Sequence, residues 1–485
     1  MRCPRSACTT PRVSLATEDA SLRRSLRLVK LAWVCGAVWL YITTGAVLTR
    51  YAKLVELPPY GYGLLAALPF AGSLFQLPAS LFLERYGHRK KWFIGLGIVH
   101  RALWLVIALL PWVLPAPWRW PGFLVTTAVS WIAGQMIVPA WVGWMGDLVP
   151  ARIRGRYFSR RTQLGQLVGL VTTVTTGFLL DRATAAGEAA LLQMLSVALA
   201  VAAGAGIADF LFFLPVRAVE SRAPNAAVSA AGLLRAPLAD ANFRRFLGFT
   251  MTLTFGTGFL AQFFWLYAFE ELKFGNATAN LMLVVIPLLT VAATSPFWGR
   301  VMDRVGRKPV LLVAGLLIVP GSFWWVLMTP TTLWPWYLGV ILATAVWPAI
   351  ELANFNVLLN LREDESTRRQ AGGYVAVGSL AVALAGALSG MFGGAVAQAC
   401  RDARPQWLGI EWTYHRVLFT VSSAFRLLAV GWLIGFRDPK AVTTRAALRY
   451  MGTNVYSNLQ QAFFLPVRFL SRLGAATYKV GKRRH

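Results

Sequence analysis

The chain has 485 residues, of which 56% are hydrophobic and 14% are charged, and its formal net charge is +28. An ordinary soluble protein is about half apolar and about a quarter charged, so this composition indicates that lipid, rather than water, is the main solvent. The positive charge does not indicate nucleic-acid binding, because the Lys and Arg residues fall mostly in short segments between long apolar runs and form no contiguous basic face.

The N-terminal 30 residues are basic and lack a short apolar core that ends in a small-residue cleavage site. We therefore expect the first apolar run, from Leu31 to about Thr49, to be a retained first helix rather than a cleaved signal peptide. The four cysteines form no CxxC pair and no metal-type spacing, so we expect no disulfide framework, no metal site and no cofactor.

Apolar runs long enough to cross a hydrocarbon core recur along the chain, where crossing takes about 20 residues at about 1.5 Å each. Gly and Pro inside these runs are tolerated because neighbouring helices satisfy the freed backbone groups. The twelve runs predict an all-α integral membrane protein. The predicted spans are 31–49, 63–83, 92–114, 121–145, 163–180, 190–214, 246–268, 280–298, 309–328, 335–358, 372–398 and 417–436.

The connecting segments alternate in charge. Those on the side of the N-terminal tail hold 38 Lys or Arg residues, and those on the other side hold 8. Since Lys and Arg accumulate in cytoplasmic loops, this ratio predicts that both termini lie in the cytoplasm and that the number of spans is even. The longest internal connection then separates two six-helix halves. The predicted organisation is a basic tail at 1–30, a first half at 31–214, a central cytoplasmic loop at 215–245, a second half at 246–436 and a basic tail at 437–485.

Two predicted cytoplasmic turns have similar sequences. One starts at Ser80 and reads SLFLERYGHRK, and the other starts at Gly299 and reads GRVMDRVGRKP. Their acids, Glu84 and Asp303, are 219 residues apart, which is close to the length of one six-span block. The repeat therefore indicates a duplicated half. Glycine in each turn can supply the unusual backbone angles of a tight connection.

This repeat resembles the loop motif of the major facilitator superfamily, Gly-x-x-x-Asp-Arg-x-Gly-Arg-Arg/Lys, which follows spans two and eight. The second copy matches in full, whereas the first has Ser80, Glu84 and His88 in place of Gly, Asp and Arg. The segment from Trp144 to Tyr157 also looks like the family's turn after span four, and a weaker counterpart follows span ten. The resemblance covers about residues 31–436.

The resemblance implies two six-helix halves that rock about a central cavity lined by spans 1, 4, 7 and 10, with spans 3, 6, 9 and 12 as an outer support. Family members are uniporters, symporters or antiporters, often driven by protons. The motif turns would stabilise the closed cytoplasmic side. The candidate residues of this gate are Glu84, Arg85, Gly87, Arg89, Asp303, Arg304, Gly306, Arg307, Asp147 and Arg154.

Charged groups at membrane depth are costly, so each is a functional hypothesis. Glu351 in span ten is the strongest candidate, because the resemblance places this span at the cavity and because a buried carboxylate can load and release a proton. The alternative is a permanent ion pair with a buried Arg. Arg101 in span three and Arg426 in span twelve would neutralise a carboxylate or bond helix carbonyls, and a sharper hypothesis makes Glu351 and Arg426 a switchable pair.

Polar residues in the predicted cavity spans are candidates to bind a substrate, with helix–helix bonding as the equal alternative. Asp209 and Asp147 lie near cytoplasmic span ends, where a topological or gating role is expected, whereas Glu270 and Glu271 at the outer end of span seven are expected to be solvated. The cavity candidates are Asn354, Asn356, Gln135, Gln262, Tyr41 and Thr44.

Together these features predict a secondary transporter of a small solute that works by alternating access, with protons as the candidate coupling ion. We expect a monomer that contacts membrane lipid, lies in the cytoplasmic membrane and is not an enzyme. The alternatives are a transporter-like receptor or lipid scramblase, and then a membrane-embedded enzyme, which the short outer loops disfavour.

Overall fold

The computed structural model describes residues 12–218, 235, 237–360, 371–407, 409–438 and 441–452, without the side chains of residues 12–19, 84, 151, 355–356, 358–360 and 371–372. In this part of the chain, twelve helical segments are long and apolar enough to cross a membrane, which confirms the predicted number of spans. Their bounds are Ala20–Ile42, Pro59–Leu83, Arg89–Val113, Ala116–Leu148, Arg152–Ala186, Glu188–Leu211, Ala241–Glu270, Asn276–Val305, Arg307–Leu327, Tyr337–Asn354, Gly373–Ala399 and Tyr414–Ile434.

The first span begins and ends earlier than predicted, at Ala20 and Ile42 in place of 31 and 49, and the fifth span extends beyond its predicted bounds at both ends. Residues 163–180 were expected from hydropathy, whereas helix α8 runs from Ala151 to Ala186. Its first turns are rich in Arg, and helical hydrogen bonding needs no apolar side chains, so the helix continues beyond the apolar run at both ends. Hydropathy marks only the part of a helix that suits lipid.

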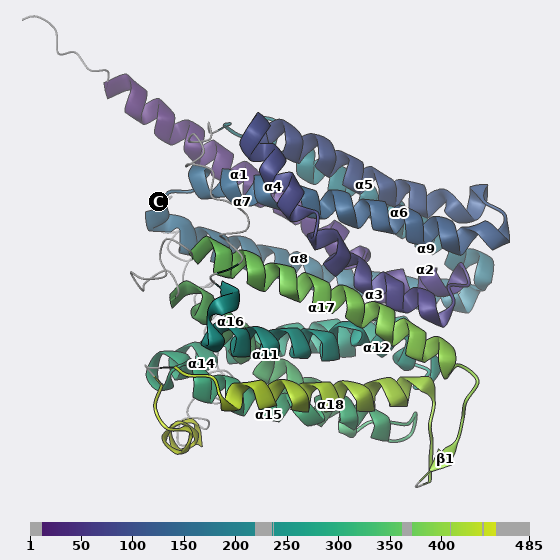
Figure 1. The fold of residues 1–485 in the computed structure, drawn as a ribbon. Coiled ribbons are helices and arrows are strands. Elements are labelled where there is room, and N and C mark those ends of the chain that lie inside the picture. Colours follow the sequence, from purple (N-terminus) through teal and green to yellow (C-terminus); the bar gives the residue numbers. More distant parts are fainter. Residues whose placement is uncertain are drawn as a thin grey trace, which may run out of the picture. The chain divides into compact units, whose positions relative to one another are not determined.

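The chain divides into two compact units, and the first comprises Met1–Glu56 and Gly72–Asn225. In this unit α1 packs against α8 and α9, and α5 packs against α6 and α9 (Figure 1). Aromatic side chains fill part of its core, among them Phe93, Trp144, Phe210 and Phe213. Its helices are α1 (Arg12–Ile42), α2 (Ala46–Leu54), α4 (Gln76–Tyr86), α5 (Arg89–Val113), α6 (Ala116–Met136), α7 (Val138–Leu148), α8 and α9 (Glu188–Leu211).

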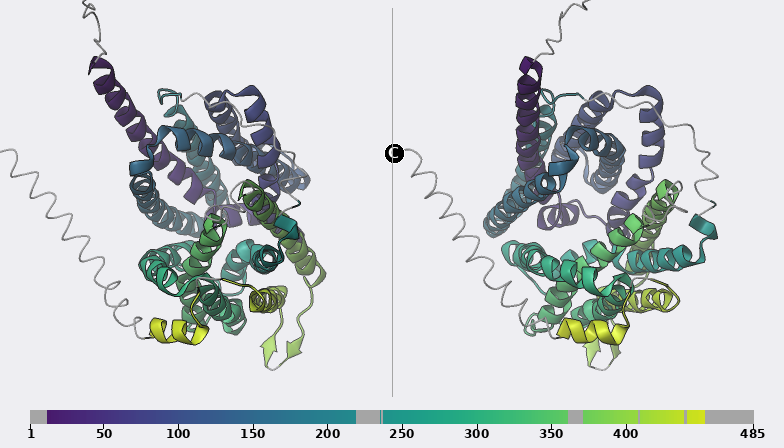
Figure 2. Two further views of the ribbon diagram at one scale, coloured as in Figure 1. Left: turned by 60° about the vertical axis from the view of Figure 1, so that its left-hand side comes forward. Right: turned by 90° about the vertical axis from the view of Figure 1, so that its left-hand side faces the viewer.

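The second unit comprises Leu57–Ala71 and Ala226–His485. Here α11 packs against α17 and α18, and α15 packs against α16 and α18. A short hairpin of strands β1 and β2 extends away from these helices (Figure 2). Its elements are α3 (Pro59–Ser73), α11 (Ala241–Gly258), α12 (Leu260–Glu270), α13 (Asn276–Asn280), η1 (Leu281–Val285), α14 (Ile286–Val305), α15 (Arg307–Phe323), η2 (Trp324–Leu327), η3 (Tyr337–Leu342), α16 (Ala343–Asn360), α17 (Ala371–Ala399), β1 (Gln406–Trp407), β2 (Ile410–Glu411) and α18 (Tyr414–Ile434).

Helix α3 belongs to the second unit because its backbone packs closely on α17. A Cβ atom at Gly63 would lie 2.3 Å from Cα of Gly394 and 2.4 Å from the carbonyl oxygen of Gly390, so only glycine fits. Small residues let membrane helices approach in this way. The predicted first half, 31–214, includes Leu57–Ala71, which the contacts group with the second unit.

The seventh span is interrupted between α11 and α12, at Phe259. Ser389 of α17 lies at the interruption, where its hydroxyl donates to the carbonyl of Phe255 at 2.6 Å and accepts from the backbone N–H of Phe259 at 2.8 Å. Ser389 is fully buried, so the two hydrogen bonds satisfy backbone groups that water cannot reach.

Candidate functional site

Arg101 is buried at the middle of α5 and is held from several sides. Its Nη2 lies 3.6 Å from Oδ2 of Asp209 on α9, and its Nη1 lies 3.1 Å from Nε2 of the neighbouring His100. Its guanidinium also stacks over the ring of Trp39, 3.3 Å from the ring centre. The sequence identified Arg101 and left its partner open, and the structure shows that the partner is a carboxylate.

A cavity of about 390 Å³ opens beside this pair, and we name it the first pocket. Arg161 of α8 also lines it, with its guanidinium 4.1 Å from the ring centre of Trp33 and 5.1 Å from that of Trp141. Arg161 precedes the predicted fifth span, 163–180, so hydropathy gives no indication that it lies inside the helix bundle. The first pocket therefore holds two guanidinium groups and one carboxylate, that of Asp209.

Arg426 is buried near the middle of α18 and has a different environment. Its Nη1 donates to the carbonyl of Ile318 on α15 at 3.0 Å, and its Nε has no hydrogen-bond partner. Within the described residues no carboxylate forms an ion pair with it. Arg426 lines a cavity of about 270 Å³, which we name the second pocket.

The two arginines occupy corresponding places in their units. Arg101 lies between the third and sixth spans of the chain, and Arg426 lies between the ninth and twelfth. Each arginine side chain passes over a glycine of the facing helix. A Cβ atom at Gly206 would lie 2.5 Å from Cδ of Arg101, and one at Gly321 would lie 3.1 Å from Nη1 of Arg426. The two sites differ in that Arg101 has an acidic partner, Asp209, whereas Arg426 has none among the described residues.

Glu351 does not form the hypothesised pair with Arg426. Its side chain is exposed, and its Oε1 accepts a hydrogen bond of 2.8 Å from the indole of Trp347, one turn earlier on α16. Trp347 lines the second pocket, whereas Glu351 does not. The buried Oδ1 of Asn354 has no hydrogen-bond partner within the described chain, and the side chain of Asn356 lies outside it.

The other four cavity candidates line neither pocket, and two of them have hydrogen-bond partners. The amide oxygen of Gln135 accepts from Gln76 at 2.6 Å, which is the helix–helix bond kept open as the alternative. Thr44 follows the end of α1 and donates to the carbonyl of Leu40 in that helix at 2.8 Å. Tyr41 and Gln262 are half-buried, and neither lines the first or second pocket.

Both motif turns have the backbone that their glycines predict, since φ is +66° at Gly87 and +83° at Gly306. In the first turn Arg89 forms an ion pair of 3.0 Å with Asp147, and both side chains are partly exposed. Arg154 donates to the carbonyls of Gly146 and Val149, which ties α8 to the end of α7. The side chain of Glu84 lies outside the described residues, and Arg85 is exposed.

The second turn is joined to the segment after α18. Arg307 donates from Nη2 to Oδ1 of Asp438 at 2.8 Å, and the backbone N–H groups of Arg307 and Lys308 point at Oδ2. Burial alone would raise the pKa of Asp438, but these hydrogen bonds and the Arg307 charge hold the pKa below its ordinary value. Asp303 and Arg304 are exposed. Sequence spacing gave no indication that Asp438 is the partner.

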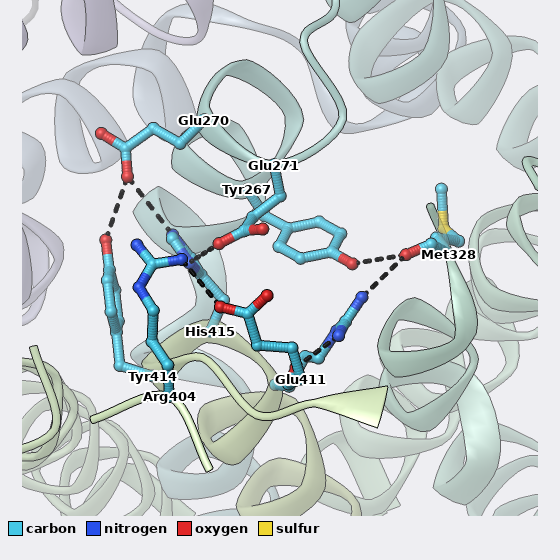
Figure 3. Close-up of polar contacts among 9 residues, drawn as sticks. Tyr267, Glu270, Glu271, Met328, Arg404, Glu411, Tyr414 and His415 are labelled. Carbon is cyan, nitrogen blue, oxygen red and sulfur yellow. Dashed lines mark hydrogen bonds and ion pairs between the residues drawn. The ribbon is translucent and has the colours of Figure 1, made fainter. Parts of the chain in front are cut away.

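A polar cluster lies at the end of the seventh span opposite the Gly306 turn (Figure 3). His415 is buried, with Nε2 at 3.8 Å from Glu270 and Nδ1 at 3.8 Å from Glu271. Tyr414 donates to Glu270 at 3.2 Å. The two glutamates were expected to be solvated, yet α18 brings a histidine between them. No group of three His, Cys, Asp or Glu residues in the described chain is arranged to hold a metal ion.

Twelve spans in two units, with charged pockets inside the helix bundles, define a polytopic membrane protein of the transporter type. The sequence profile of the Major Facilitator Superfamily matches residues 34–390 and 270–470. The chain therefore belongs to this superfamily, which confirms the resemblance carried by the motif turns. No curated protein sequence shows significant similarity to the chain.

Solved structures of transporters share the fold. The nucleoside transporter NupG superposes with a TM-score of 0.61 at 13% identity, over 86% of this chain and 98% of that one. A bacterial homologue of the human lysosomal transporter Spinster gives 0.61 at 14%, over 87% and 99%. The xylose transporter XylE from E. coli gives 0.55 at 14%, over 87% and 98%. At these identities the likeness establishes the fold alone.

Proposed function

We propose that the chain is a secondary transporter that moves a small organic solute across the cytoplasmic membrane by alternating access, with both termini in the cytoplasm. The observation that supports this most is the presence of a buried guanidinium in a pocket of each unit. Charge at membrane depth is costly and is kept where a pathway or binding site uses it. A bundle that served only as an anchor would fill these positions with apolar side chains.

We further propose that Glu351 couples solute movement to protons. Its carboxylate accepts from the neutral indole of Trp347 and has no cationic partner within the described residues. A carboxylate without a fixed cation can change its protonation as its surroundings change. Trp347 connects it to the second pocket, so occupancy of the pocket and protonation of Glu351 can influence each other.

The test is proton flux in liposomes that contain the purified protein and a pH-sensitive dye, screened against pools of small solutes. Solute-dependent proton movement that disappears in Glu351→Gln and persists in Glu411→Gln supports the proposal. Glu411 is the matched control because it is a partly exposed hairpin residue paired with Arg404. Lipid flip-flop without movement of any solute would instead identify a scramblase and contradict the proposal.

A further inference from the structure

Arg426 has unused hydrogen-bonding capacity. A guanidinium has five N–H donors, and one of them meets the carbonyl of Ile318 while the Nε donor meets nothing. Arg426 is only 5% exposed, so water reaches little of its side chain. Arg101 also has a buried Nε donor without a hydrogen-bond partner, but Asp209 supplies a negative charge beside it.

The described residues near the second pocket offer no counter-ion. The pocket lining contains no acid, and Glu351 is bonded to Trp347 outside it. Glu270 and Glu271 lie against His415 at the end of the span. A buried charge without a partner is strongly unfavourable, so this site attracts an anion from outside the unit.

The rest of the lining selects the anion. Thr257 and Thr344 donate their hydroxyl protons to carbonyls of their own helices, at 2.9 Å from Leu253 and 2.7 Å from Val340, so the pocket offers no free hydroxyl donor. The other walls are largely apolar and aromatic. They include Phe264, Leu283, Pro287, Ile318, Trp325 and Trp347. A ligand that fits has one anionic head and an apolar body.

We propose that the second pocket binds a small organic monocarboxylate, with its carboxylate on Arg426 and its body against Trp325 and Trp347. A single guanidinium matches a carboxylate in charge and in planar geometry. The volume of about 270 Å³ limits the ligand to a small acid. This proposal gives the proposed transporter a substrate class, and its transport step rests on the proposed function. Binding of the carboxylate at Arg426 does not depend on transport.

The test is ligand-dependent thermal stability of the full chain in detergent. The probes are benzoate, phenylacetate and isovalerate, each beside its neutral amide, with chloride and inorganic phosphate as further anions. We expect the carboxylates to raise the melting temperature with saturation and the amides to leave it unchanged. Arg426→Gln should weaken carboxylate binding by a factor of about 30 or more, and Arg404→Gln should not. Equal shifts by the amides, a retained response in Arg426→Gln, or no response to any carboxylate would overturn the assignment.

A second variant separates binding from folding. Ala261 lines the second pocket, and Ala261→Leu fills the space of the ligand body without touching the charge. It should weaken phenylacetate more than isovalerate, whereas a general folding defect would lower the ligand-free melting temperature and leave the preference among acids unchanged. An unchanged preference among the acids in Ala261→Leu would contradict the proposed binding site. Carboxylate binding without solute flux would leave this site standing and remove the transport proposal, and solute flux without carboxylate binding would do the reverse.

Discussion

Arg101 and Asp209 meet inside the first unit, with 3.6 Å between Nη2 and Oδ2 and less than a tenth of either side chain exposed. Arg161 is a second cation whose charge acts on the same carboxylate. Asp209 thus balances one of two guanidinium groups, and the first pocket keeps a net charge of +1 from its described lining. The second pocket has the same net charge from Arg426 alone.

Asp209→Asn should destabilise the protein strongly. It leaves Arg101 buried without its counter-ion, and breaking a buried pair from one side costs about 3–5 kcal/mol. Thermal unfolding in detergent measures the loss. The double variant Asp209→Asn with Arg101→Gln should lose less than the sum of the two single variants, because the uncompensated charge is gone. Additive losses would show that the two residues do not interact.

Asp438→Asn and Asp147→Asn form a matched pair, because each acid meets an arginine of a motif turn. The Asp438 side chain is fully covered and accepts backbone and side-chain hydrogen bonds, so its loss should cost about 1–3 kcal/mol. The Asp147 side chain is 45% exposed, so its loss should cost less than about 1 kcal/mol. Melting temperatures of both variants check the order, and a reversed order would show that the second turn is not fastened through Asp438.

The lowered pKa of Asp438 predicts that the stability of the protein depends on pH. Because the folded-state pKa of Asp438 is lowered, its contribution is present above its ordinary pKa of about 4 and is lost as the pH falls through the folded value. The difference in melting temperature between the wild type and Asp438→Asn should therefore be constant near neutrality and shrink on acidification below about pH 4. A difference that does not change with pH would argue against the lowered pKa.

Ser389→Ala should loosen the interruption of the seventh span. The change leaves the buried N–H of Phe259 without its acceptor, and an unsatisfied buried group costs about 1–3 kcal/mol. Ser423→Ala is the control, since the half-buried Ser423 bonds only with the hydroxyl of Ser322 among its described partners. Hydrogen exchange of residues 255–260 should rise in Ser389→Ala alone. Equal exchange in both variants would mean that Ser389 does not hold the interruption.

The sequence predicted the span count, the turn glycines and the two buried arginines, because each depends on one local property. Hydropathy identifies a span, the turn needs a positive φ at Gly87 and Gly306, and a charge inside an apolar run is conspicuous wherever it packs. The partners could not be predicted in this way. Asp209 and Arg101 are 108 residues apart in the sequence, and no local sequence pattern indicates that they are in contact.

Other partners could not be predicted for the same reason. The hypothesis that Glu351 pairs with Arg426 rested on their occurrence in the same half. In the structure Glu351 instead accepts a hydrogen bond from the indole N–H of Trp347. Arg161 falls outside the predicted fifth span because α8 continues beyond its apolar run. His415 was placed outside the predicted twelfth span, and only the packing of α18 shows that it lies between Glu270 and Glu271 (Figure 3).

The central claim is that the chain carries solutes across a membrane, and solute counterflow tests it most directly. Liposomes containing the protein are loaded with unlabelled small carboxylates and other solute pools, then diluted into a trace of the labelled compound. The account predicts transient accumulation of at least one labelled solute, absent from empty liposomes and from liposomes with heat-inactivated protein. Equal labelling of all three preparations for every solute class would contradict the account.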